Sequence, residues 1–192
     1  RNPLTVKKYI RPNTKLVHVE TPTNPLLELC DIETTAAICK EAGVLLSVDN
    51  SFMSPYGQRP LDLGADVVMQ SSTKSLSGHS DILGGVLTTN SDDLDERLRF
   101  LLKATGGVPS PFDNWILLRS TKTLGLRYQK ASDNANELAN WLADQENLSR
   151  VIYPGLKNHP QHKIAIKQQQ TPSGEVIFGN MVSIDVGTIE AR

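Results

Sequence analysis

Hydrophobic residues in the first half of the chain alternate between short continuous runs and helical stripes. Short runs rich in Val, Leu and Ile predict β-strands over residues 15–20, 44–49, 66–71 and 82–88. Stretches with apolar residues at helical spacing separate or follow these runs. Strands interleaved with helices are typical of a mostly parallel sheet covered on both faces. The pattern therefore predicts an α/β fold.

Two of the predicted helices carry clear signals at their ends. Asp31 is placed to cap a helix that runs through Glu41 and that Gly43 would end. Ser91 is placed to cap a second helix through Leu102, with two aspartates in its first turn. Negative charge there is favourable because the helix dipole is positive at its N-terminus.

The pattern changes beyond Leu118. One long helical pattern runs from Tyr128 to Glu146, with the apolar residues Ala135, Leu138, Ala139 and Leu142 on a single face. A shorter basic helix over residues 161–169 and a strand over 181–185 follow it. We therefore predict a change of domain near Leu126, which divides the chain into residues 1–126 and 127–192.

Composition and charge exclude several classes of protein. The chain of 192 residues has 20 basic and 21 acidic residues, and this balance gives no basic surface for nucleic acid. Its longest apolar stretches, such as Val44–Val48, are too short to cross a bilayer. No basic and then apolar leader opens the chain, so secretion is not indicated and a cytoplasmic protein is expected. Because the first residue is Arg1 and not Met, the natural start can lie upstream.

The two cysteines do not form a recognisable motif. Cys30 and Cys39 lack the CxxC spacing of metal and redox sites, so we expect small, buried or partly buried thiols. His159 and His162 are three residues apart, but no third metal ligand accompanies them. We interpret both histidines as solvated surface residues and predict no metal site.

Two charged residues lie where an α/β sheet binds its ligands, outside the carboxyl ends of the strands. Asp49 closes the predicted strand 44–49, and Lys74 follows the strand 66–71 in the segment SSTKSLSGHSD. The pair could form a simple salt bridge. Lys74 and Ser75 also resemble the end of a nucleotide-binding P-loop, but the glycines required before that lysine are absent.

A pyridoxal-phosphate (PLP) site is a more specific interpretation. Such a site needs a lysine to bind the cofactor and an acid that keeps the pyridine nitrogen protonated. Ser71 and Thr73 occupy alternate positions before Lys74, so in an extended segment both hydroxyls point to one side. They are candidate donors to the phosphate, although hydroxyl residues are also common in ordinary turns.

Several long blocks of the chain resemble the Cys/Met-metabolism family of PLP-dependent enzymes, the trans-sulfuration enzymes. The first is ETPTNP, at residues 20–25. The others cover residues 48–68, 71–86, 97–115, 122–127 and 151–162. The resemblance thus extends over nearly the whole chain. It implies the fold type I architecture of the PLP-dependent transferases, with residues 1–126 in the PLP-binding large domain and residues 127–192 at the start of a smaller α/β C-terminal domain.

The resemblance assigns a role to each candidate residue. It implies that Lys74 forms the Schiff base with PLP and moves protons during catalysis, and that Asp49 is the partner of the pyridine nitrogen. It implies that Ser71 and Thr73 donate to the cofactor phosphate. Asn24, in TPTNP, matches an asparagine near the 3′-oxygen of the cofactor and the substrate carboxylate; the alternative is a turn residue in a Pro-rich loop.

Within the family, the blocks FMSPYGQRPLDLGAD, VPSPFD, VIYPGL and HPQH are most similar to the cystathionine γ-lyase branch. The implied activity is carbon–sulfur cleavage of cystathionine or a related sulfur amino acid by α,γ-elimination, giving cysteine, 2-oxobutanoate and ammonia. Cystathionine β-lyase, cystathionine γ-synthase and methionine γ-lyase remain open. Small departures, such as Ser51 where the family often has threonine, affect only the choice of branch.

The chain lacks some parts that the resemblance implies. An aromatic residue that stacks on the cofactor and further phosphate ligands, some from a neighbouring subunit, are expected before Arg1. An arginine for the substrate carboxylate is expected after Arg192. The resemblance also implies a homo-oligomer, a tetramer. A hypothesis of another class is a non-catalytic fragment or assembly module, which the short length favours and the retained site residues oppose.

Overall fold

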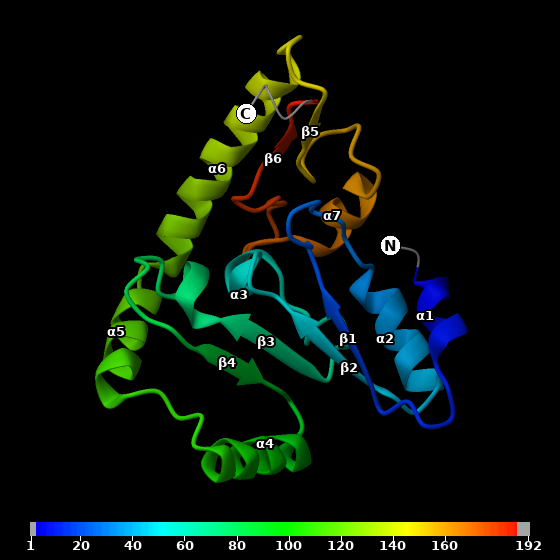
Figure 1. Ribbon diagram of the computed structural model, residues 1–192, viewed down its shortest axis with the longest axis vertical. Helices are drawn as coiled ribbons and strands as arrows, with labels where there is room; N and C mark the ends of the chain where they lie inside the picture. The colour runs from blue at the N-terminus through cyan, green and yellow to red at the C-terminus, as the bar shows by residue number, and fades with distance from the viewer. Residues whose placement is uncertain (1–2, 188–192) are drawn as a thin grey trace.

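The computed structural model describes residues 3–187, and its main element is a four-stranded sheet in the order β1-β2-β3-β4 (Figure 1). Strands β1 (Leu16–Glu20), β2 (Leu45–Asp49) and β3 (Val67–Ser71) are parallel, and β4 (Gly85–Thr88) is antiparallel to β3. The predicted mostly parallel sheet is confirmed. β4 is shorter than the predicted strand 82–88 because Gly84 instead bonds to the turn after β3, where its carbonyl accepts from the Ser72 amide.

Helices α1 (Leu4–Tyr9) and α2 (Ile32–Glu41) lie beside β1 and β2, and the short helix α3 (Ser54–Gly57) follows β2. The predicted ends of α2 are confirmed. The Asp31 side chain accepts a hydrogen bond from the Thr34 amide at 3.0 Å, and Gly43 has φ of +64° just beyond the helix. The main core joins α2 to the sheet, with Ile32, Ala36, Cys39, Leu46, Val48 and Val68 all buried. Cys30 and Cys39 are free thiols.

Three helices form the next part of the chain: α4 (Asp92–Thr105), α5 (Pro111–Thr121) and α6 (Leu124–Ala143). Ser91 caps α4 as predicted, but the helix continues beyond Leu102 until Gly106, which has a left-handed conformation. The sequence pattern does not predict α5. Helix α6 begins before Tyr128 and ends before Glu146, so its predicted bounds are a few residues too late.

Helices α4 and α5 expose several large apolar side chains. No residue of α4 is buried, and Phe112, Trp115 and Leu118 of α5 are each more than half exposed, at 66%, 59% and 69%. The rings of Phe112 and Trp115 stack with centroids 6.1 Å apart. Contiguous exposed apolar side chains of this kind mark interaction surfaces.

The C-terminal part has a two-stranded antiparallel sheet, β5 (Arg150–Ile152) with β6 (Ser183–Asp185), and helix α7 (His162–Gln168). α7 and β6 confirm the predicted helix 161–169 and strand 181–185, with shorter bounds, whereas β5 is not predicted. Ala135 and Ala139 of α6 pack against buried Tyr153 and Leu156. The expected boundary at Leu126 falls near the start of α6, and the division into two domains stays a prediction. Residues 1–2 and 188–192 of the expected domains lie outside the described residues.

A chain of buried side-chain amides ties α7 to the strand ends. Asn50 follows β2, and its Oδ1 accepts from Gln58 Nε2 at 2.8 Å. Gln58 Oε1 in turn accepts from Gln168 Nε2 of α7 at 3.1 Å, and Gln168 Oε1 accepts from the amide of Ile32 at 3.2 Å. All three amides are buried. We refer to Asn50, Gln58 and Gln168 as the amide chain.

Candidate active site

The carboxyl ends of β1, β2 and β3 meet at one edge of the sheet, as the parallel order requires. Glu20 and Asp49 end β1 and β2 and lie opposite each other in register. Ser71 ends β3, and the chain then forms η1 (Ser72–Leu76), an irregular helical turn that contains Lys74. The sheet therefore brings the predicted acid and the turn with the predicted lysine to the same edge.

Lys74 lies on the wall of a cavity of about 470 Å³, which we call the lysine cavity. Its lining includes Thr73, Ser51, Arg127 and Asn180. The Lys74 side chain is exposed, and it forms no ion pair with any residue between 3 and 187. A simple salt bridge between Lys74 and Asp49 is therefore not present, and the amine is free to react with a small molecule.

Ser51 connects the predicted site residues Asp49 and Ser71 to the lysine cavity. Its backbone amide donates to Asp49 Oδ1 at 2.9 Å, and its hydroxyl accepts from the Ser71 amide at 2.7 Å. Ser51 also lines the lysine cavity, whereas Asp49 is not part of the lining. In the sequence, Ser51 is distinguished only as a departure from the family pattern. Only the folded chain reveals that it joins the ends of β2 and β3.

Asp49 is half-buried and lies in a region of negative charge. Burial raises the pKa of the neighbouring Glu20 carboxyl, the negative charge of Asp49 raises it further, and a hydrogen bond from the Asn24 backbone opposes both effects. No lysine or arginine of the described chain forms an ion pair with Asp49. The charge of His18 also lowers the pKa of Glu20, but neither carboxyl has a lysine or arginine partner among residues 3–187, which favours a positively charged ligand at this edge.

The two hydroxyl residues have different positions. Thr73 lies on the wall of the lysine cavity, and its Oγ1 accepts from the Gly84 amide at 3.2 Å. Ser71 is half-buried at the end of β3 and is not on that wall. Their different positions follow from the backbone, because the segment leaves its extended conformation at Ser72. The expectation that both hydroxyls serve one phosphate stays a prediction.

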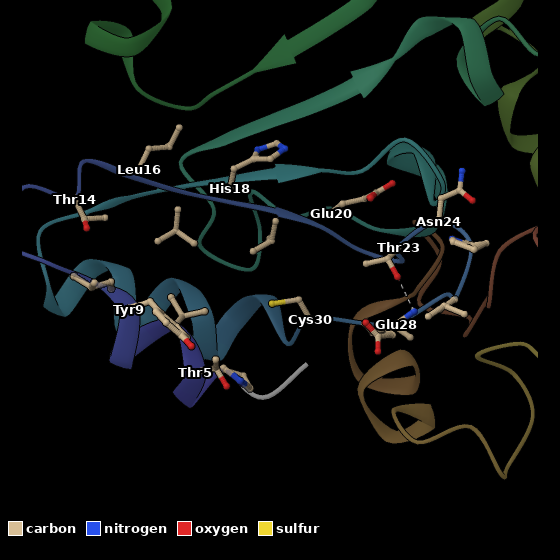
Figure 2. Close-up of a pocket in the computed structure, with 18 residues that line it drawn as sticks. Thr5, Tyr9, Thr14, Leu16, His18, Glu20, Thr23, Asn24, Glu28 and Cys30 are labelled. Carbon is tan, nitrogen blue, oxygen red and sulfur yellow. Dashed lines mark hydrogen bonds between the residues drawn. The ribbon is translucent and has the colours of Figure 1, made fainter.

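Asn24 lies in a second cavity, which we call the β1 cavity (Figure 2). This cavity has a volume of about 710 Å³, and its walls are α1, β1 and the segment that follows β1. Figure 2 shows Asn24 and Glu20 at one end of it and Tyr9 and Leu16 farther along. The described residues do not bring Asn24 onto the wall of the lysine cavity, and its role at the cofactor stays a prediction.

Arg127 is a residue of the lysine cavity that the sequence analysis did not single out. It belongs to the block KTLGLR, so the family resemblance was the only signal for it. Its contacts with the turn that carries Lys74 join residues about fifty positions apart. No spacing rule predicts such a contact.

The expectation for the histidines is wrong in part. His159 is only 7% exposed, and burial lowers the pKa of its imidazole. His162 is half-buried, stacks on Phe178 and has its Nδ1 2.7 Å from the Pro154 carbonyl. His162 packs within the C-terminal part, whereas His159 also meets the backbone of Leu27. Among residues 3–187, no group of three or more His, Cys, Asp or Glu side chains is placed to hold a metal ion.

Comparisons with known proteins agree with this geometry. Residues 1–191 match the sequence model of the family described as Cys/Met metabolism PLP-dependent enzyme. The chain is 49% identical to cystathionine gamma-lyase of Bacillus subtilis over 185 residues, which cover 96% of this chain and 47% of the relative. It is 46% identical to a probable cystathionine gamma-synthase of Herpetosiphon aurantiacus over 183 residues, 95% of this chain and 56% of the relative.

Solved structures give the same result. The crystal structure of cystathionine gamma-lyase from Lactobacillus plantarum, complexed with L-serine, matches with a TM-score of 0.92 and 38% identity, over 97% of this chain and 47% of that one. The yeast cystathionine gamma-lyase matches with a TM-score of 0.90 and 45% identity, over 97% and 48%. The chain thus spans about half the length of these relatives. The shared fold confirms the predicted fold type I architecture, and the chain belongs to the family of Cys/Met metabolism PLP-dependent enzymes.

Proposed function

We propose that the protein is a PLP-dependent carbon–sulfur lyase that cleaves cystathionine or a related sulfur amino acid by α,γ-elimination, giving cysteine, 2-oxobutanoate and ammonia. One observation carries the proposal: in a member of this PLP-dependent family, the amine of Lys74 lies without an ion pair among the described residues, on a cavity wall beyond the strand ends. A lysine in that position is the group that binds PLP through its aldehyde.

The residues present fit the cofactor. Lys74 supplies the amine, Asp49 supplies a carboxylate without a protein cation among residues 3–187, and Thr73 supplies a hydroxyl on the cavity wall. We assign Asp49 to the pyridine nitrogen, Thr73 and Ser71 to the phosphate, and Asn24 to the 3′-oxygen side. PLP, when bound, withdraws electrons from the α-carbon of the substrate.

The chain's own groups then bind, orient and move protons. Lys74 would hold PLP through its aldehyde, and its Nζ would serve as the general base for the α-proton of the substrate. The negative charge of Asp49 would favour the protonated pyridine nitrogen, and the adjacent Glu20 would add to this effect when ionised. Ser51 holds the Asp49 carboxylate in place through its amide.

A synthase is the second candidate, because relatives named cystathionine gamma-synthase are as similar as the lyases, for example at 49% identity in Mycobacterium tuberculosis. In that reaction an incoming thiol attacks the γ-carbon and displaces its substituent. Cystathionine β-lyase and methionine γ-lyase activities are further alternatives within the family. The reactions differ in their products, so product analysis distinguishes them.

We also propose a cytoplasmic homo-oligomer, a tetramer. The exposed apolar side chains of α4 and α5 support association with further protein surface. No helix among the described residues is long and apolar enough to span a membrane. The near-neutral charge supports a small-molecule substrate and not a nucleic acid.

The proposal is tested first by cofactor attachment. The purified protein is mixed with PLP, reduced with borohydride and digested, and the modified peptide is identified by mass spectrometry. We expect visible absorbance before reduction and a label on Lys74 afterwards. A colourless protein without a label on Lys74 would contradict the proposal and favour the non-catalytic fragment or assembly module.

The second test identifies the product. The protein with bound PLP is incubated with cystathionine, and the oxo acid is separated by chromatography. 2-Oxobutanoate is expected for the γ-lyase, whereas pyruvate would identify a β-lyase. A parallel incubation with cysteine and an activated homoserine ester tests the synthase, for which cystathionine would be the product.

A further inference from the structure

Arg127 makes an extensive set of contacts in the described chain. The residue lies in the first turn of α6, next to the turn η1. Its Nη1 donates to the carbonyl of Ser75 at 3.0 Å, and its Nη2 donates to the carbonyls of Leu76 at 3.3 Å and Ser120 at 2.9 Å. Its Nε donates to Thr123 Oγ1 at 3.0 Å. The guanidinium therefore joins the end of α5 and the start of α6 to η1.

All of these acceptors are neutral. No carboxylate of residues 3–187 pairs with Arg127, although it is partly buried and burial lowers its pKa. Hydrogen bonds from a charged group to carbonyl oxygens are stronger than those between neutral groups. A planar guanidinium can reach several carbonyls at once, which a lysine ammonium on a flexible stem cannot reproduce.

The contacts converge on the backbone next to Lys74. Ser75 and Leu76 directly follow it in η1, and the Gly78 amide donates to the Lys74 carbonyl at 2.8 Å. A Cβ atom at Gly78 would lie 1.9 Å from Arg127 Nη1, so only glycine leaves room for the guanidinium. Gly78 also has φ of +72°, a conformation that glycine adopts readily.

We propose that Arg127 is a positioning residue that holds η1 against α6 and thereby directs the amine of Lys74 into the lysine cavity. The catalytic effect of this positioning rests on the proposed function, in which Lys74 binds PLP. Arg127 and Lys74 line the same cavity, so a shift of η1 relative to α6 changes the direction of the lysine side chain. Displacement of a reacting group by about 1 Å is enough to slow a reaction by about 10²-fold.

The main test compares Arg127→Met, which removes the hydrogen bonds, with Arg127→Lys, which keeps the charge. In Arg127→Met we expect Lys74 to attach PLP at least about tenfold more slowly, and the visible circular dichroism of the bound cofactor to weaken. Arg127→Lys is expected to recover part of the rate. Arg99→Met is the matched control, because Arg99 pairs only with Asp95 on the exposed helix α4.

Hydrogen exchange of the cofactor-free protein gives an independent readout. We expect the amides of residues 72–78 to exchange about tenfold faster in Arg127→Met, the change that corresponds to one lost charged hydrogen bond. The amides of β2 are expected to exchange as in the wild type. This measurement separates the two proposals, because it needs no bound PLP.

A double-mutant cycle tests the role of Gly78. Gly78→Ala is expected to displace the guanidinium and to slow PLP attachment as Arg127→Met does. The double variant is expected to be no slower than Gly78→Ala alone, because both changes remove the same contact. Independent, multiplicative losses would overturn the proposed contact.

Each outcome is decisive. Wild-type rate and dichroism in Arg127→Met would overturn the positioning role, even if the melting temperature falls. If Arg127→Met does not fold, the test uses Arg127→Lys instead. A wild-type rate of PLP attachment in Arg127→Lys, with normal exchange of residues 72–78, would overturn the positioning role. If the wild-type protein itself attaches no PLP, the proposed function fails while the exchange measurement still tests the hold on η1.

Discussion

The lysine cavity and the β1 cavity differ in size and in chemistry, and the larger cavity is not the one that contains the predicted catalytic lysine. The β1 cavity is larger, at about 710 Å³ against about 470 Å³, and its walls are mainly apolar side chains of α1 and β1. The lysine cavity contains an amine, several hydroxyls and a guanidinium. The amine of Lys74 therefore lies beyond β3, whereas the larger cavity has the carboxyls of Glu20 and Glu28 and the thiol of Cys30 on its wall.

The reason for this difference lies in the sheet. β1 is the edge strand of the described sheet, and its outer side faces α1 across the β1 cavity (Figure 2). The large volume there reflects a strand edge with little cover. The lysine cavity instead lies where β3 ends and the backbone turns through η1, which is where α/β sheets place ligand groups. Cavity volume alone selects the β1 cavity, whereas the predicted residues Lys74 and Thr73 line the lysine cavity.

The sharpest test of the comparison is Lys74→Ala. We expect complete loss of the borohydride-stable label and of cystathionine cleavage, because no other lysine among residues 3–187 lines the lysine cavity. Mass spectrometry of the labelled peptides checks this result. Lys103→Ala on the exposed helix α4 is the control and is expected to behave as the wild type. Equal labelling of Lys74→Ala would place the reactive amine elsewhere.

Asp49→Asn is expected to have the next largest effect. The amide keeps an oxygen for the Ser51 backbone amide but removes the negative charge that stabilises a protonated ring. Losing such an electrostatic contribution slows catalysis by about 10²–10³-fold. Single-turnover elimination by the PLP-loaded protein measures the effect. A rate within a factor of two of the wild type would show that Asp49 has no role at the ring.

Ser51→Ala is expected to have a moderate effect, because the Ser71 amide loses its acceptor between β2 and β3. Removing one partly buried hydrogen bond reduces the free energy of unfolding by about 1 kcal/mol. Urea denaturation checks the value. Ser51→Thr retains the hydroxyl and serves as the control, with stability close to that of the wild type.

A smaller effect is expected at Glu20, which belongs to both regions because it lines the β1 cavity and lies opposite Asp49. Its folded-state pKa is raised above the ordinary value of 4.5, so the unfolded chain ionises first as the pH rises. The contribution of Glu20 to stability therefore declines from about pH 4.5 through its raised pKa. Between pH 4 and 7, the melting temperature is expected to fall less in Glu20→Gln than in the wild type. An unchanged profile would contradict the raised pKa of Glu20, which burial and then the charge of Asp49 produce.

Tyr9→Ser is expected to have the smallest effect on chemistry. Tyr9 is an exposed side chain on the wall of the β1 cavity, far along it from Asn24 (Figure 2). We expect PLP attachment and elimination rates like those of the wild type. A several-fold loss in either rate would mean that the β1 cavity also contributes to the chemistry.

Local signals in the sequence were sufficient for the strands of the four-stranded sheet and for the helices with clear ends, but not for β5. Asp31 and Gly43 delimit α2, and the continuous apolar run of β2 identifies a buried strand. Helix α5 was missed because its apolar residues surround the helix instead of forming one stripe. The available signal was its N-terminus, where Ser110 caps the helix and Pro111 occupies its first position.

In the candidate site, too, some residues could be predicted from local sequence signals and others could not. Asp49 and the turn with Lys74 could be placed from the strand pattern because parallel strands end at a common edge. Ser51 and Arg127 could not, because their roles depend on hydrogen bonds to residues distant in the sequence. Asn24 lies in the other cavity because the loop after β1 carries it away from η1. Motifs therefore identify reactive groups more readily than the residues that orient them.

The amide chain has a consequence for how the polypeptide can be divided. Asn50, Gln58 and Gln168 bond to one another in a dry interior, although about 110 residues separate the last two. A version of the chain that stops before α7 would leave three partners of Gln168 unmatched, at a cost of about 1–3 kcal/mol for each group that stays buried. These partners are Gln58 Oε1, the Ile32 amide and the Cys30 carbonyl. Excised pieces of the N-terminal sheet are accordingly poor subjects for biophysics, and α7 belongs in every expressed fragment.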